Sequence, residues 1–172
     1  MDLILRDLAD KQAIADIQAR YCRALNRMDK AMAYDLFRDD CRVNYHGIYE
    51  GTGRGFVDWV WQAHAQMERH SHQVTNMLID NNGDCAVSEA YVTVVLWTLA
   101  DDEGVQKEIV CRGRYLDRLE QEEGQWRITQ REHVVGMHSV YVLERAAVSD
   151  CSTRDRSDAS WRFFSDSMGK TQ

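Results

Sequence analysis

The histidine at position 72 has the residue type and the surroundings that proton-transfer chemistry needs. It lies in residues 71–80, which alternate with the period of two of a β-strand. One face of that strand places an imidazole and a carboxamide among aliphatic groups: His72, Val74, Asn76 and Leu78. A neutral imidazole, with a solution pKa of about 6.5, can accept a proton near neutral pH. The pattern therefore predicts either a general base or a hydrogen-bonded histidine of the sheet.

His70 and His72 are also spaced like a pair of metal ligands on one face of a strand. Neither a glutamate nor a partner histidine follows at ligand spacing, and Asn76 is a poor substitute. The five scattered cysteines contain no Cys-x-x-Cys pair, so they predict neither a zinc motif nor a disulfide framework. We therefore predict no metal, and we place His70 at a pocket rim or at the surface.

The first helix is followed by a carboxylate. Apolar residues recur three and four positions apart over residues 10–28, which predicts an amphipathic helix. They are Ile14, Ile17, Tyr21, Leu25 and Met28. Asp29 comes four residues after Leu25, so it lies at the end of the apolar stripe. It can cap a second helix, residues 30–37, or act as a functional carboxylate, and the two roles are compatible.

The remaining segments predict a long antiparallel sheet. Residues 41–49 form two short strands, and residues 56–68 form a third helix. Turns rich in Asn, Asp and Gly then separate the strand at 71–80 from strands at residues 85–100, 105–119 and 125–142. Strands of about 50 Å must curl in a domain this small, with Gly113 and Gly136 as bend or bulge points. The fold class is α+β, with a curved antiparallel sheet forming a cone-shaped barrel capped by the N-terminal helices.

The composition of the chain limits the classes of partner that we expect for the protein. The chain has 172 residues, 44% of them hydrophobic, which fits one domain at residues 1–143 and a polar tail at 144–172. We expect the tail to dock on the outer sheet face or on a neighbouring subunit through three aromatic residues: Trp161, Phe163 and Phe164. A net charge of −7 without a basic run argues against nucleic acid and anionic membranes. The acidic start does not resemble a signal peptide, and no apolar run approaches the ~20 residues of a membrane helix, so we expect a cytoplasmic protein.

The order and spacing of six short motifs resemble the SnoaL-like branch of the nuclear-transport-factor-2-like, or cystatin-like, superfamily of α+β barrels. The motifs, within residues 8–140, are Tyr21-x-x-x-Leu25-x-x-x-Asp29, Asp35-Leu-Phe37, Tyr49-Glu-Gly51, His72-x-x-x-Asn76, Tyr115-x-Asp-Arg118 and Gly124-x-Trp-Arg-Ile128. The pattern is most similar to a group that includes scytalone dehydratase, hexachlorocyclohexane dehydrochlorinase and the bile-acid dehydratases. The resemblance implies that His72 is a catalytic base and that Asp29 orients it.

The resemblance also implies a reaction class. It is a cofactor-independent β-elimination, as in a dehydratase or dehydrohalogenase, on a small hydrophobic cyclic molecule bound by a homo-oligomer, either a dimer or a trimer. Candidate substrate-binding residues are Tyr21, Leu25, Tyr45, Trp61, Asn76, Trp97 and Arg114. Candidates to assist the leaving group are Tyr21, Tyr45, Asn76, Arg112, Arg114 and His133. Alternatives are an isomerase of the ketosteroid-isomerase kind, with Tyr21 or Tyr45 as oxyanion donor, and a binding module without turnover.

The chain departs from that group at two places. Ala24 stands where the dehydrochlorinase has a lysine, so a cationic group for a leaving halide is missing there. Residues 91–97, on the second long strand, are all uncharged, so the second histidine or aspartate of some dehydratases has no equivalent.

Overall fold

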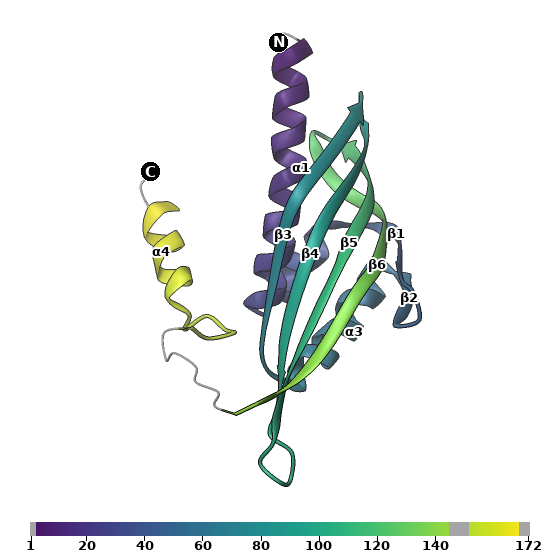
Figure 1. Ribbon diagram of the computed structural model, residues 1–172. Helices are drawn as coiled ribbons and strands as arrows, with labels where there is room; N and C mark the ends of the chain where they lie inside the picture. The colour runs from purple at the N-terminus through teal and green to yellow at the C-terminus, as the bar shows by residue number, and fades with distance from the viewer. Residues whose placement is uncertain (1–2, 145–151, 169–172) are drawn as a thin grey trace.

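The computed structural model describes residues 3–144 and 152–168 and shows a strongly curved sheet beside a layer of helices (Figure 1). In chain order the elements are α1 (Leu3–Asn26), α2 (Lys30–Asp35), β1 (Phe37–Tyr45), β2 (Tyr49–Thr52), α3 (Gly53–Ala65), β3 (Met67–Asn82), β4 (Cys85–Thr98), β5 (Gln106–Glu122), β6 (Gln125–Leu143) and α4 (Ala159–Met168). The strand order is β2-β1-β6-β5-β4-β3. The predicted α+β class and curled sheet are confirmed.

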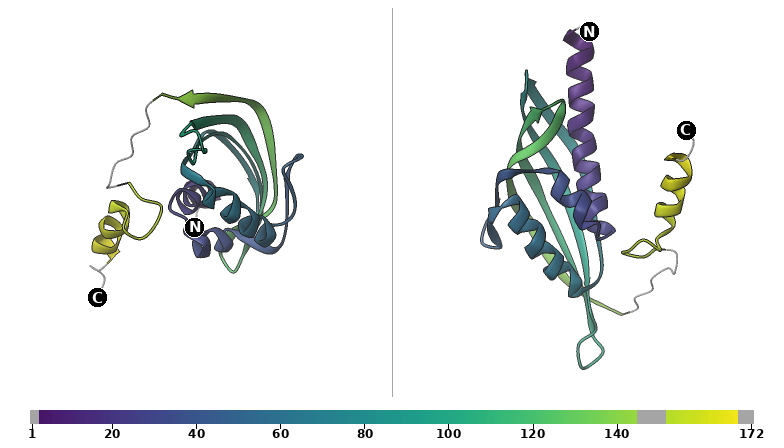
Figure 2. Two further views of the ribbon diagram at one scale, coloured as in Figure 1. Left: turned by 90° about the horizontal axis from the view of Figure 1, so that it is seen from below. Right: turned by 180° about the vertical axis from the view of Figure 1, so that it is seen from behind.

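The sheet curves without closing on itself, and the helices complete the cone. Seen from below, the strands arc around α1, α2 and α3, which lie on the concave side (Figure 2). All pairings are antiparallel except that of β1 with β6, which is parallel. The predicted antiparallel sheet therefore contains one parallel pair. A parallel pair requires a long crossover, and here the intervening helix α3 and strands β3 to β5 supply it.

Sheet pairing overrides local helix propensity at two boundaries. β1 begins at Phe37, earlier than predicted, because Phe37 pairs with Ile128 and the Ile128 N–H donates to the Leu36 carbonyl at 2.9 Å. α3 begins at Gly53, where the Thr52 hydroxyl accepts from the Gly55 N–H at 3.1 Å and caps the helix. It ends at Ala65, so the segment predicted as its last turn opens β3 instead.

Bulges bend the long strands. Between the pairs Arg112–Met137 and Gly113–Val135, β6 contains the extra residue Gly136, so the predicted bulge at these glycines is confirmed. A Cβ on Gly113 would collide with the Val134 carbonyl oxygen, which explains why this close approach requires glycine.

A fully desolvated ion pair lies in the core near the middle of the cone. Arg131 on β6 and Asp117 on β5 have no exposed side-chain surface, and two parallel N–H···O bonds of 2.8 and 2.7 Å join them. Gln18 of α1 hydrogen-bonds both partners. The guanidinium carbon lies 4.2 Å from the Tyr21 ring centroid and 4.4 Å from that of Tyr115. The charge is therefore compensated by a carboxylate and two aromatic faces.

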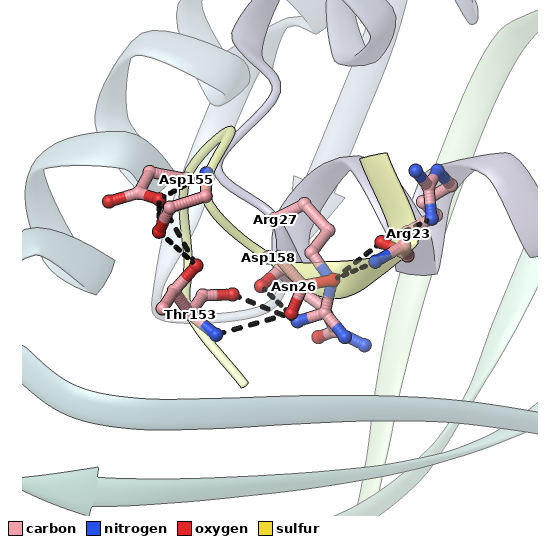
Figure 3. Close-up of polar contacts among 8 residues, drawn as sticks. Arg23, Asn26, Arg27, Thr153, Asp155 and Asp158 are labelled. Atoms are coloured by element: carbon pink, nitrogen blue, oxygen red, sulfur yellow. Dashed lines mark hydrogen bonds and ion pairs between the residues drawn. The ribbon is translucent and has the colours of Figure 1, made fainter. Parts of the chain in front are cut away.

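The C-terminal segment contacts the end of α1 (Figure 1). Of the two predicted docking places, the outer face of the sheet is not the one these contacts use, and docking on a neighbouring subunit stays a prediction. Asp158, which is 4% exposed, lies 3.1 Å from the Arg27 guanidinium, and the Arg27 side chain also donates to the Thr153 carbonyl at 3.3 Å (Figure 3). The Arg23 guanidinium carbon lies 4.6 Å from the Phe164 ring centroid. Charged residues at the end of α1 therefore hold this segment. No helix in the described ranges has the length and apolar character needed to cross a membrane.

Candidate functional site

Three buried imidazoles meet where the end of α3 joins the start of β3. His64 comes from the last turn of α3, and His70 and His72 come from β3. The ring centroids are 4.3 Å apart for His64 and His70, 5.3 Å for His64 and His72, and 5.8 Å for His70 and His72. Each side chain is less than a tenth exposed. His70 was predicted at a rim or at the surface; it is instead a buried member of this histidine cluster.

The partner of His72 is Asn26, the last residue of α1. Asn26 Oδ1 accepts from the His72 backbone N–H at 2.9 Å, and its Nδ2 donates to the His72 carbonyl at 3.3 Å, so the backbone fixes the orientation of the amide. The same Oδ1 lies 2.9 Å from His72 Nδ1. Because an amide oxygen can only accept, Nδ1 carries the proton. His72 Nε2 then carries a lone pair and has no hydrogen-bond partner within residues 3–144 and 152–168.

Within the described residues, the Asp29 carboxylate makes no hydrogen bond or ion pair with the His72 ring. Its carboxylate accepts from the Met32 N–H at 3.2 Å and caps α2, so the predicted helix cap is confirmed. Met28 adopts a left-handed conformation with φ 51°, and the Asp29 N–H donates to the Ala24 carbonyl at 2.9 Å. This turn directs the carboxylate along α2, whereas Asn26, one turn of chain earlier, lies against β3. The predicted Asp29–His72 pair is therefore replaced by an Asn26–His72 pair.

His70 has the opposite tautomer. Its Nε2 lies 2.7 Å from the Leu25 carbonyl oxygen and must donate to it, so the neutral ring accepts at Nδ1. The donor there is Arg154 Nη1, at 3.3 Å, which also donates to the His64 carbonyl at 2.7 Å. Both His70 nitrogens are thus occupied. Within the described residues, His72 Nε2 and His64 Nδ1 have no hydrogen-bond partner, and of these two rings only His72 has its tautomer fixed by a neighbour.

Burial keeps the cluster neutral. Burial lowers the pKa of His64 to about 3 and that of His70 to about 4, and in both cases the charge of Arg154 contributes. The pKa of His72 lies well below 6.5, first because of burial and then because of His64 and His70. Burial likewise lowers the pKa of His133 to about 4. The rings are therefore neutral bases at pH 7.

We expect these histidines to make the fold acid-sensitive. Their folded pKa values lie below the unfolded value of about 6.5, so the unfolded chain binds more protons between pH 6.5 and about 4. Stability is then complete above about pH 7 and falls toward pH 4, by up to about 1.4 kcal/mol per pH unit for each such histidine. Urea unfolding at several pH values measures this slope. His64→Phe should reduce the slope and His138→Asn, at an exposed position, should not; an unchanged slope in both variants would contradict the expectation.

Replacing Asn26 with aspartate should raise the pKa of His72, because a carboxylate favours the imidazolium form that the neutral amide does not stabilise. Histidine C–H signals in a pH titration by NMR measure this directly. Asn26→Ala is the matched control: it also removes the amide but adds no charge. If the His72 pKa were the same in the Asp and Ala variants, the side chain at position 26 would not contact the ring.

Three of the predicted pocket residues do face the interior. Tyr21 and Tyr45 are buried, and their hydroxyl oxygens lie 2.9 Å apart. Leu25 is 1% exposed, and its backbone carbonyl accepts a hydrogen bond from the His70 ring. The Tyr45 ring stacks on Phe56 at 4.4 Å, and Tyr115 lies edge-on to Tyr21. Packed aromatic rings therefore line this part of the cone.

The other four predicted pocket residues are placed differently. Asn76 is exposed with φ 48°, at a bulge between the pairs Thr75–Tyr91 and Leu78–Glu89. The extra residue reverses the alternation of β3, so Asn76 leaves the face that carries His72. Trp97 and Arg114 lie on the opposite face of the sheet from the inward Val94 and Tyr115, and they bind Glu108 and Glu89. Trp61 of α3 is half-buried at the edge of the core.

Three residues of the site were not singled out from the sequence as its parts: Asn26, His64 and Arg154. His133, a predicted candidate to assist the leaving group, is buried. The ring of His133 lies 4.8 Å from that of Tyr45, and neither ring nitrogen has a partner in the described part of the chain. The apolar spacing of α3 already marked His64 as inward-facing. Among the described residues, no group of three or more His, Cys, Asp or Glu has an arrangement that could hold a metal ion.

Comparisons with known proteins agree with this architecture. A model of the SnoaL-like domain matches residues 6–132. Rv3472 from Mycobacterium tuberculosis, a protein of unknown function, is 28% identical over 78% of this chain and 76% of its own, with a TM-score of 0.66. A candidate scytalone dehydratase from Novosphingobium aromaticivorans is 23% identical over 84% and 95%, with a TM-score of 0.69.

The hexachlorocyclohexane dehydrochlorinase LinA-type3 from Novosphingobium barchaimii is 15% identical over 84% of this chain and 97% of its own, with a TM-score of 0.70. At these identities the dehydratase and dehydrochlorinase comparisons establish a shared fold. A search of curated proteins finds no match.

Proposed function

We propose that this chain, which belongs to the SnoaL-like domain family, is a lyase that needs no cofactor and eliminates a small group from a hydrophobic cyclic substrate. The observation that carries the proposal is the fixed tautomer of His72: Asn26 Oδ1, at 2.9 Å, holds the proton on Nδ1 and leaves the Nε2 lone pair free. The fold shared with the dehydratase and dehydrochlorinase structures supports a reaction of this class.

In the proposed reaction, His72 Nε2 takes a proton from a carbon atom of the substrate. The electron pair of that carbon–hydrogen bond forms a new double bond, and the leaving group departs from the adjacent carbon with the pair that held it. The proton then passes from Nε2 to the leaving group or to water, which restores the neutral ring. Asn26 orients the ring throughout, as the third member of a nucleophile–base–orienter set does in other enzymes.

The low pKa of His72 limits the substrate. A weak base removes a proton efficiently only from an activated carbon, and the amide of Asn26 gives the imidazolium no ionic partner. The substrate must therefore carry its carbon–hydrogen bond beside a carbonyl or another electron-withdrawing group. Asp29 acts in this proposal as a positioning residue, because its cap on α2 fixes the turn that follows Asn26.

One observation favours isomerisation as a second candidate. The Tyr21 and Tyr45 hydroxyl groups form a buried hydrogen-bonded pair at 2.9 Å, and such a pair can donate to a developing oxyanion. In that reaction His72 would move a proton between two carbons of an unsaturated ketone, and no group would leave.

A substrate panel tests both candidates. Cyclic alcohols and halides bearing an adjacent activating group report elimination by the rise of alkene absorbance, and β,γ-unsaturated cyclic ketones report isomerisation. Turnover by the wild type and its loss in His72→Gln would support the proposal. Equal turnover by both proteins would remove the mechanism, and tight binding of these compounds without turnover would favour a binding module instead.

A further inference from the structure

Three arginines from separate segments surround His70. Arg27 directly follows α1, Arg69 lies near the start of β3, and Arg154 comes from the segment before α4. The charges of all three disfavour protonation of His70. Near them, Asp158 pairs with Arg27 at 3.1 Å and Glu68 pairs with Arg69 at 3.4 Å. Three guanidinium charges against these two carboxylates leave one positive charge, although the whole chain has a net charge of −7.

Within the described ranges, Arg154 is the arginine of this group that makes no ion pair with a carboxylate, and the charge of Glu68 acts on it only at longer range. Its Nη1 donates to the His64 carbonyl at 2.7 Å and to His70 Nδ1 at 3.3 Å, and both acceptors are uncharged. Its Nε and Nη2 make no hydrogen bond there. Burial, and then the charge of Arg69, lower the pKa of Arg154. A half-buried guanidinium of this kind gains from an anionic partner.

Arg69 supplies a further hydrogen-bond donor without a partner near Arg154. Its Nη1 is engaged by Glu68, but its Nε is buried and has no hydrogen-bond partner in the part of the chain that the structure describes. Guanidinium N–H groups match a planar carboxylate, which can accept two of them at once. The pair Arg69 and Arg154 thus offers charge and donors at the edge of the histidine cluster.

We propose that Arg154, assisted by Arg69, binds a carboxylate of the substrate, so that the cyclic substrate of the proposed lyase is an organic acid. The rings of His70 and His72 are 5.8 Å apart, and Arg154 Nη1 contacts the far ring. A carboxylate bound at Arg154 would therefore lie at the edge of the histidine cluster, next to His70. A single negative charge also balances the one unpaired positive charge.

This inference rests on the proposed function for the identity of the site, but binding tests it without turnover. Isothermal titration calorimetry compares 2-naphthoate with 2-naphthamide, which has the same ring system and no charge, on the full chain. The wild type should prefer the acid by at least about 10-fold, because a charge-assisted hydrogen bond is stronger than one to a neutral amide. Arg154→Gln should reduce the preference to less than about 3-fold, and Arg154→Lys should retain part of it.

Arg162→Gln is the matched control, because Arg162 is an exposed arginine of α4 in the same segment. It should keep the wild-type preference. Equal binding of acid and amide by the wild type would overturn the proposal, as would an Arg154→Gln variant that keeps the preference. In the latter case, a melting temperature of Arg154→Gln below that of the wild type would show that Arg154 only holds the C-terminal segment against the domain. If the wild type preferred the acid but turned over no substrate, the proposed lyase activity would be contradicted and the proposed anion site would be retained.

Discussion

Replacing His72 with glutamine is expected to lower kcat about 10²–10⁴-fold on any substrate that the wild type eliminates, because the base that takes the proton is lost. Glutamine is close to imidazole in size and can still hydrogen-bond Asn26, so substrate binding and the fold should change little. Steady-state kinetics that separate kcat from KM measure the effect. The expected result is a loss in kcat, with KM within a few-fold of the wild-type value.

Two controls isolate the chemistry from the packing. His64→Gln changes a buried neighbour whose ring lies 5.3 Å from His72 but removes no group with a proposed proton-transfer role, so it should cost much less in kcat. His138→Gln, at an exposed position, should cost nothing. A His72→Gln variant with both the kcat and the melting temperature of the wild type would exclude His72 as the base.

Replacing Arg131 with methionine is expected to give the largest loss of stability, about 3–5 kcal/mol, because it leaves Asp117 charged and unpaired in the core. Both side chains of the pair have no exposed surface, so water cannot compensate. Urea unfolding measures the loss as a shift of the midpoint at unchanged slope.

The double variant Arg131→Met with Asp117→Leu should recover much of this loss, since both charges are then absent. The surface pair of Arg114 and Glu89, each more than a third exposed, provides the comparison: Arg114→Gln should cost less than about 1 kcal/mol. If the Arg131 single variant cost no more than the Arg114 variant, the buried pair would not support the core as described.

Local patterns in the chain were sufficient for much of the architecture. Period-two alternation and turns rich in Asn, Asp and Gly placed the four long strands β3 to β6, and three-and-four spacing placed α1, because these signals act between residues close in sequence. The same reasoning put His72 and Tyr21 inside, whereas Tyr45 was a candidate only through the resemblance to the SnoaL-like group. It failed at Asn76, where one inserted residue in a left-handed conformation reverses the strand faces, although asparagine tolerates that conformation more readily than most residues do.

The partners of the reacting groups were decided by tertiary structure. Whether Asn26 or Asp29 meets His72 depends on where α1 ends against β3, and a single left-handed residue at Met28 shifts that choice by a turn. Arg154 lies 84 positions beyond His70 along the chain, so no local pattern links them. By itself, the sequence determined which residues could carry the chemistry and on which elements they sit. Docking of the helices and the C-terminal segment onto the sheet decided which of them touch, because contact between distant segments depends on packing across the whole core.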